Sequence, residues 1–169
     1  MMSKSVTKRI LGIDPGYGRC GFGIIEEKNR DWYCLTHGVI TTSKEKGHAA
    51  RLLEIFEDLR VLIAKYQPTT LVIEELFFAK STTTALKVAE ARGVILLLAE
   101  EQGLDIIEVK PNEVKMSVTG YGKAEKQQIQ EMVKTLFGFK ETPKPDDAAD
   151  ALAVAWCGTG RCNDMREQE

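Results

Sequence analysis

Four carboxylates in this chain occupy positions that suit divalent-metal chemistry. Asp14 ends the apolar run RILGID, and Glu74 ends the apolar run TLVIE. Asp147 and Asp150 stand three residues apart in an alanine-rich segment, so on a helix they lie on one face. Because like charges repel and an isolated buried carboxylate is costly, a cluster of these four acids implies bound divalent cations.

The donor set indicates the metal and the reaction. Carboxylate oxygens, with no histidine or thiolate among them, favour Mg²⁺ or Mn²⁺ over Zn²⁺. Two such ions about 3.5 to 4 Å apart can hold the attacking and leaving oxygens of an in-line phosphoryl displacement. We therefore expect hydrolysis of a phosphodiester by metal-activated water. Asp14 is the expected bridging ligand, and the other three acids would complete the two metal shells.

Two of these acids, and two of their neighbours, also have a simpler interpretation. Asp14 precedes a proline and is a typical turn residue. Asp146 and Asp147 are acids of the kind that cap a helix and favour its N-terminal dipole, and for Asp146 this is the favoured interpretation. Glu75 is expected to point away from the side of the strand that carries Glu74, because side chains alternate along a strand, so it is not expected to be a ligand. The combined order Asp, Glu, Asp-x-x-Asp along the chain favours the metal site.

The elements that must position these acids follow an α/β pattern. Strands are predicted at 9–14, 20–27, 32–42, 70–74 and 105–109, and helices at 49–66, 81–102, 112–118, 123–137 and 147–156. Three antiparallel strands followed by alternating helix and strand predict a mixed α/β layer architecture. If the first helix returns the chain beside the first strand, Asp14 and Glu74 meet at one edge of the sheet. The alanines of the last helix would let it lie close to the same sheet.

Length and composition are those of a single domain. The chain has 169 residues, of which 43% are hydrophobic, enough for one buried core. We predict one nuclease domain over residues 1–158 and a flexible polar tail over 159–169. No apolar stretch reaches the length of a membrane span and the start lacks a signal peptide, so a cytoplasmic location is expected. The four cysteines have no zinc-site spacing and are interpreted as buried or incidental thiols.

The charge distribution is uneven. The net charge of −2 argues against a general nucleic-acid coat protein. Between Lys110 and Lys144, however, seven lysines stand against four glutamates, a local balance of +3. If cations neutralise the four acids, this basic region is left to face phosphate.

Five longer motifs lie along the chain: LGIDPG (11–16), VIEELFFAKS (72–81), ALKVAEARG (85–93), GYGKAEKQQIQEMV (120–133) and DAADALAVA (147–155). Through these motifs the chain resembles, from about residue 9 to 157, the RuvC family of Holliday-junction resolvases. It implies a ribonuclease-H-like fold with a five-stranded mixed sheet, and an enzyme that nicks four-way DNA junctions symmetrically in recombination and repair. It also implies that Asp14, Glu74, Asp147 and Asp150 are the metal ligands, the same four acids that the residue pattern selects.

The resemblance further implies residues that contact DNA. Lys115 and Lys126 match lysines that assist binding or catalysis in the family, although a solvated helix face explains either lysine equally well. Phe77 matches an aromatic residue that stacks on unpaired bases at the junction. Lys80 would reach a phosphate. Core packing is the expected role of the adjacent Phe78.

The predicted helix 81–102 favours self-association, although its row of small residues would also suit packing on the sheet alone. Ala85, Ala89 and Gly93 form a row of small residues, and the segment 94–99 is apolar nearly all round, which suggests a second buried face. A homodimer agrees with the resemblance, which also implies a branch-migration motor complex as a partner.

The sequence is also compatible with three other functions. The first is another ribonuclease-H-like nuclease that cuts RNA/DNA hybrids. The second is an actin-like or sugar-kinase-type ATPase, whose phosphate loop resembles DPGYGRCG. The third is a junction-binding module without activity, which the presence of all four acids disfavours.

Overall fold

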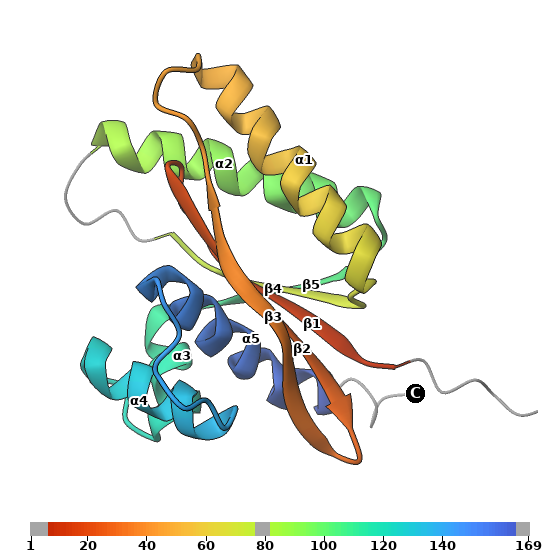
Figure 1. The fold of residues 1–169 in the computed structure, drawn as a ribbon, viewed down its shortest axis with the longest axis vertical. Helices are drawn as coiled ribbons and strands as arrows, with labels where there is room; N and C mark the ends of the chain where they lie inside the picture. The colour runs from red at the N-terminus through yellow and green to blue at the C-terminus, as the bar shows by residue number, and fades with distance from the viewer. Residues whose placement is uncertain (1–6, 77–81, 165–169) are drawn as a thin grey trace, which may run out of the picture.

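The computed structural model describes residues 7–76 and 82–164, which form one sheet with helices on both faces (Figure 1). The strands are β1 (Arg9–Asp14), β2 (Arg19–Lys28), β3 (Asp31–Thr41), β4 (Thr70–Glu74) and β5 (Asp105–Val109). The helices are α1 (His48–Tyr66), α2 (Thr82–Glu101), α3 (Pro111–Thr119), α4 (Lys126–Leu136) and α5 (Asp146–Asp164). Among the described residues, no helix is long and apolar enough to span a membrane.

The five strands lie in the order β3-β2-β1-β4-β5. The first three pair antiparallel, with Asp14 opposite Gly21. Helix α1 then carries the chain to the other side of β1, where β4 pairs parallel to β1 and β5 pairs parallel to β4. The predicted mixed sheet is therefore confirmed, and the ends of β1 and β4 that carry Asp14 and Glu74 lie at one edge.

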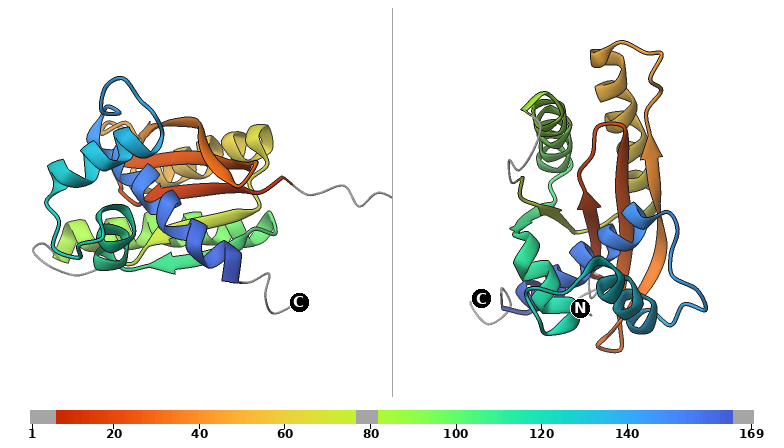
Figure 2. Two further views of the ribbon diagram at one scale, coloured as in Figure 1. Left: turned by 90° about the horizontal axis from the view of Figure 1, so that it is seen from below. Right: turned by 90° about the vertical axis from the view of Figure 1, so that its left-hand side faces the viewer.

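The sheet separates two hydrophobic layers (Figures 1 and 2). Helices α1 and α2 cover one face, where Leu11, Ile13 and Leu71 are buried. Helices α3, α4 and α5 cover the other face, over Ile10 and Val72. Because side chains alternate along a strand, Gly12 and Asp14 on β1 and Glu74 on β4 belong to the same face as Ile10 and Val72.

Helix α5 approaches the sheet closely because glycines leave room for it. A Cβ at Gly12 would lie 2.5 Å from the backbone nitrogen of Ala155 and would overlap the carbonyl oxygen of Ala151. Gly23 pairs with Gly12 across the two strands, and a Cβ there would lie 2.7 Å from the side chain of Leu152. The helix thus lies across β1 and β2 at backbone distance, which fixes the position of its first turns.

The predicted end of the last helix at Trp156 is wrong. Helix α5 continues to Asp164 because its glycines do not interrupt the packing. Gly158 packs directly on Val72, and Cys162 is buried, with its carbonyl accepting a hydrogen bond of 2.9 Å from Lys8 Nζ. Residues 159–164 of the expected tail are therefore helical, and its remainder, 165–169, lies outside the described residues. All four cysteines are free thiols.

Candidate active site

Four acids converge where β1 and β4 end beneath the start of α5. Asp14 follows Gly12 by two residues and Glu74 follows Val72 by two, so both carboxylates belong to the face that α5 covers. The backbone of Asp147 lies directly on Gly21, since a Cβ at Gly21 would lie 2.7 Å from the carbonyl carbon of Asp147. Because Gly21 pairs with Asp14, the first turn of α5 is held over the end of β1.

The acids act on one another electrostatically. Burial, and then the negative charges of Asp150, Glu74 and Asp147, raise the pKa of Asp14 to about 7, against a lowering by Lys126. Burial and the charge of Asp150 likewise raise the pKa of Glu74. Burial raises the pKa of Asp150, which Lys126 partly offsets. The site therefore holds more negative charge than its protein neighbours compensate.

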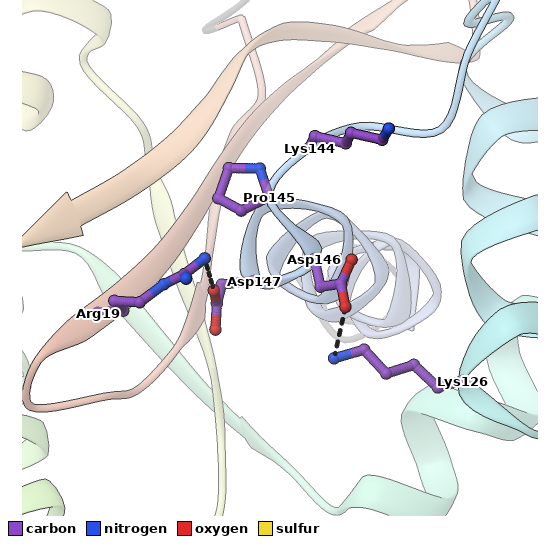
Figure 3. Close-up of a pocket in the computed structure, with 6 residues that line it drawn as sticks. All are labelled: Arg19, Lys126, Lys144, Pro145, Asp146 and Asp147. Carbon is purple, nitrogen blue, oxygen red and sulfur yellow. Dashed lines mark ion pairs between the residues drawn. The ribbon is translucent and has the colours of Figure 1, made fainter.

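Basic side chains lie against the acids of α5 (Figure 3). Arg19 Nη2 is 2.6 Å from Asp147 Oδ2, and Lys126 Nζ is 3.1 Å from Asp150 Oδ2 and 3.5 Å from Asp146 Oδ2. An open cavity of about 720 Å³ is lined by Arg19, Lys126, Lys144, Pro145, Asp146 and Asp147. A smaller cavity of about 260 Å³ is lined by Asp14, Pro15, Glu74, Glu75, Leu76 and Pro111.

The acids lie near one another but do not form a closed metal shell. Within residues 7–76 and 82–164, no three acidic, histidine or cysteine side chains are grouped as an ion-binding set. Asp147 and Asp150 pair with Arg19 and Lys126 instead. The chemistry of the donors nevertheless fits a hard divalent cation, because all four are carboxylates and burial with mutual repulsion raises the pKa of Asp14 and Glu74.

The structure places most of the sequence-predicted residues around these acids. Lys126 contacts Asp150, and Lys115 lies close enough for its charge to lower the pKa of Glu74 against the effect of burial. Phe77 and Lys80, like Phe78, lie outside the described residues. Sequence reasoning missed Arg19, since nothing in the pattern GYGRCG distinguishes it from any other arginine at the start of a strand.

The sheet order and the position of the acids define the class of protein. Three antiparallel strands continued by parallel ones, with carboxylates at the adjacent ends of β1 and β4 and on a helix across that face, are the architecture of a ribonuclease-H-like nuclease. Two solved Holliday junction resolvases share this fold at low sequence identity. That of yeast mitochondria, Ydc2, is 16% identical at a TM-score of 0.65, and that of fowlpox virus is 15% identical at 0.53.

Comparison with known sequences narrows the class to one family. Residues 10–158 match the family model described as crossover junction endodeoxyribonuclease RuvC. RuvC of Heliobacterium modesticaldum is 53% identical over 148 residues, which cover 88% of this chain and 91% of that protein. RuvC of Thermotoga maritima is 48% identical over 149 residues, covering 88% and 89%. The chain belongs to the RuvC family of crossover junction endodeoxyribonucleases.

Solved structures of this family agree. Thermus thermophilus RuvC is 31% identical, with a TM-score of 0.84 over 93% of this chain and 96% of that one. The same protein in complex with a Holliday junction substrate is 30% identical, with a TM-score of 0.88 over 94% and 96%. The predicted family and the predicted ribonuclease-H-like fold are both confirmed.

Proposed function

We propose that the protein resolves four-way DNA junctions by nicking two strands symmetrically, as a magnesium-dependent homodimer acting in recombination and repair in the cytoplasm. The observation that carries the proposal is the convergence of Asp14, Glu74, Asp147 and Asp150, from two strand ends and one helix, in a chain of the RuvC family. The junction is the proposed substrate because a related protein of the same family is described in complex with one.

Asp14, Glu74, Asp147 and Asp150 are the residues that would hold two Mg²⁺ ions, with Mn²⁺ able to substitute. Bound there, the metal would supply an activated water and stabilise the charge that develops on the phosphate. The chain itself contributes a rigid frame, because Asp14 and Glu74 lie on paired strands and the two α5 acids lie on one helix face. Products with 5′-phosphate and 3′-hydroxyl ends are expected.

The cations around the acids are proposed to contact the DNA backbone. Lys126 begins α4 and Lys115 lies on α3, so two separate helices bring a positive charge near the acids. A cation in such a position can contact the scissile phosphate or its neighbours. Phe77 and Lys80 are proposed to contact the unpaired bases and a phosphate of the junction, on the strength of the family resemblance.

Cleavage of a labelled synthetic four-way junction tests the proposal. Paired nicks that require Mg²⁺, disappear with chelator and are absent from linear duplex and from an RNA/DNA hybrid are expected. Cleavage of the hybrid instead would keep the fold and overturn the substrate. No cleavage of any substrate would favour a binding module. The family match favours the junction over the hybrid and over ATP.

Metal binding should weaken in acid because a proton competes for Asp14. The pKa of Asp14 is raised to about 7 by burial and by the other acids, so its carboxylate is charged above that pH and protonated below it. A metal that needs the charged form should lose about tenfold in affinity for each pH unit below about 7. Calorimetric titration of the protein with Mn²⁺ at a series of pH values measures this. An affinity unchanged down to about pH 5 would contradict the assignment.

The outer face of α2 is the proposed dimer interface. Leu86 and Leu97 are 57% and 66% exposed, and Gly93 between them has nothing within 4 Å of a Cβ position. We predict that Leu97→Glu converts the dimer to a monomer, because it buries a charge against the partner's apolar face. Light scattering behind a sizing column measures the mass. The matched control is Met116→Glu on α3, where the native side chain is 53% exposed, and it should leave the mass unchanged. A dimer retained by Leu97→Glu would place the interface elsewhere.

The branch-migration motor complex is proposed as a partner on the family resemblance alone. A pull-down between the purified protein and such a complex, with and without a four-way junction, tests the contact. Association in both conditions would support a direct contact. Association only when the junction is present would mean that the two meet through DNA.

A further inference from the structure

Arg19 is a cation at the acidic site that belongs to none of the motifs shared with the family. It is the first residue of β2, five positions after Asp14, and it directly follows the short turn that connects β1 to β2. Its Nη2 lies 2.6 Å from Asp147 Oδ2, and its side chain remains 54% exposed. Figure 3 shows the guanidinium reaching across from β2 to the first turn of α5.

The ion pair occupies a proposed metal ligand. Asp147 Oδ2, which accepts the contact from Arg19, is one of the carboxylate oxygens that a divalent cation would use. A guanidinium and a divalent cation repel each other, so the two compete for Asp147. Because the Arg19 side chain is 54% exposed and that of Asp147 is 29% exposed, water screens the pair, and a divalent cation can replace the guanidinium.

A released guanidinium would remain at the mouth of the site. Arg19 lines the open cavity of about 720 Å³ together with Lys126 and Lys144, so three cations surround a space at the start of α5. The planar fork of an arginine fits a phosphate with two parallel hydrogen bonds, and it keeps its charge at any physiological pH. The cavity is open to solvent.

We propose that Arg19 exchanges its counter-ion during the reaction cycle. It neutralises Asp147 while the metal is absent, and it binds a backbone phosphate of the DNA beside the cleaved bond once the metal has taken Asp147. This inference rests on the proposed function. Metal binding and DNA binding then strengthen each other through Arg19. The metal frees Arg19 from Asp147 so that it can bind phosphate, and the phosphate holds Arg19 away from Asp147 so that the metal can bind.

Arg19→Gln tests the exchange, with Ca²⁺ as the metal probe and a labelled four-way junction as the DNA probe. In calorimetric titration without DNA, the variant should bind Ca²⁺ about threefold more tightly than wild type, because the competing charge is gone. The increase in junction affinity that Ca²⁺ produces should fall by about threefold to tenfold. The salt dependence of junction binding in Ca²⁺ should lose about one unit of slope for each arginine removed. Arg19→Lys should recover the charge and part of the coupling.

The matched control is Arg60→Gln. Arg60 has the same 54% exposure and the same 2.6 Å distance to a carboxylate, that of Glu57, but it pairs within α1. It should leave Ca²⁺ affinity and junction binding at wild-type values. If wild type binds Ca²⁺ and the junction but Arg19→Gln matches Arg60→Gln in both, the exchange is overturned and the pair is only structural. If wild type binds no Ca²⁺, the proposed metal site itself fails, independently of Arg19.

Discussion

Asp14→Asn should reduce junction cleavage on the order of a thousandfold while junction binding remains near wild type. The amide lacks the negative charge with which Asp14 is proposed to hold the metal. A loss of about 4 kcal/mol of transition-state stabilisation corresponds to this factor. Single-turnover cleavage of a labelled junction, beside a gel-shift measurement of binding, separates the two effects. Cleavage retained within tenfold of wild type would remove Asp14 from the metal site.

The same substitution should stabilise the metal-free protein at pH 8. The folded-state pKa of Asp14 is raised from 3.8 to about 7, so its charged form opposes folding fully above about pH 7, and the opposition is lost as the pH falls toward 4. We expect Asp14→Asn to raise the free energy of unfolding by about 1 to 3 kcal/mol at pH 8 and by little near pH 4.

Urea unfolding with chelator at the two pH values measures this difference. Asp58→Asn is the control, because Asp58 is exposed on α1, away from the acids, and its amide should change stability little at either pH. A destabilised Asp14→Asn at pH 8 would mean that the carboxylate is better compensated in the folded protein than its raised pKa implies. An inactive but more stable variant is the expected result for a residue selected for chemistry rather than folding.

Gly12→Ala should destabilise the protein by about 3 kcal/mol and weaken cleavage as well. The added Cβ would lie 2.5 Å from the backbone nitrogen of Ala155 and would overlap the carbonyl oxygen of Ala151, so α5 must move as a whole. Overpacking of this kind in a tight core typically costs 1 to 3 kcal/mol or somewhat more. The moved helix carries Asp147 and Asp150 away from Asp14, so cleavage falls even where the variant is folded.

Gly160→Ala is the matched control for this effect. Gly160 lies on the same helix, but a Cβ there would meet nothing within 4 Å. Because alanine is favoured over glycine inside a helix by about 1 kcal/mol, this variant should be as stable as wild type or slightly more so. Thermal unfolding and cleavage at a temperature where both variants are folded make the comparison. Equal stability of Gly12→Ala and Gly160→Ala would show that α5 is not held at backbone distance.

Gly12 and Arg19 thus control the site in different ways. Gly12 sets how near α5 lies to the sheet, and therefore where its two acids stand relative to Asp14 and Glu74. Arg19 forms an ion pair with one of those acids, Asp147. The proposed site depends on both kinds of residue, since its four acids come from two strands and a helix.

The sequence alone determined the acids and the elements that carry them. Asp14 and Glu74 end short apolar runs that predict strands, and Asp147 and Asp150 have helical spacing. Both patterns are local, so they can be recognised without knowledge of the fold. The family motifs then determined the ribonuclease-H-like sheet. The predicted end of the last helix at residue 156 is wrong. Glycines at 158 and 160 favour a helix end when only the local sequence is considered, but Gly158 packs on Val72 of β4 and α5 continues to Asp164.

Only the tertiary structure decided which charges meet. That Arg19 faces Asp147 and Lys126 faces Asp150 depends on how α5 crosses the sheet and how α4 packs on α5, and these are contacts between residues 24 to 128 positions apart. The raised pKa of Asp14 arises in the same way, from burial beneath α5 and from three carboxylates distant in sequence. Secondary structure follows local periodicity. Which charged groups interact depends instead on the distance between their side chains in the folded chain, and packing determines that distance.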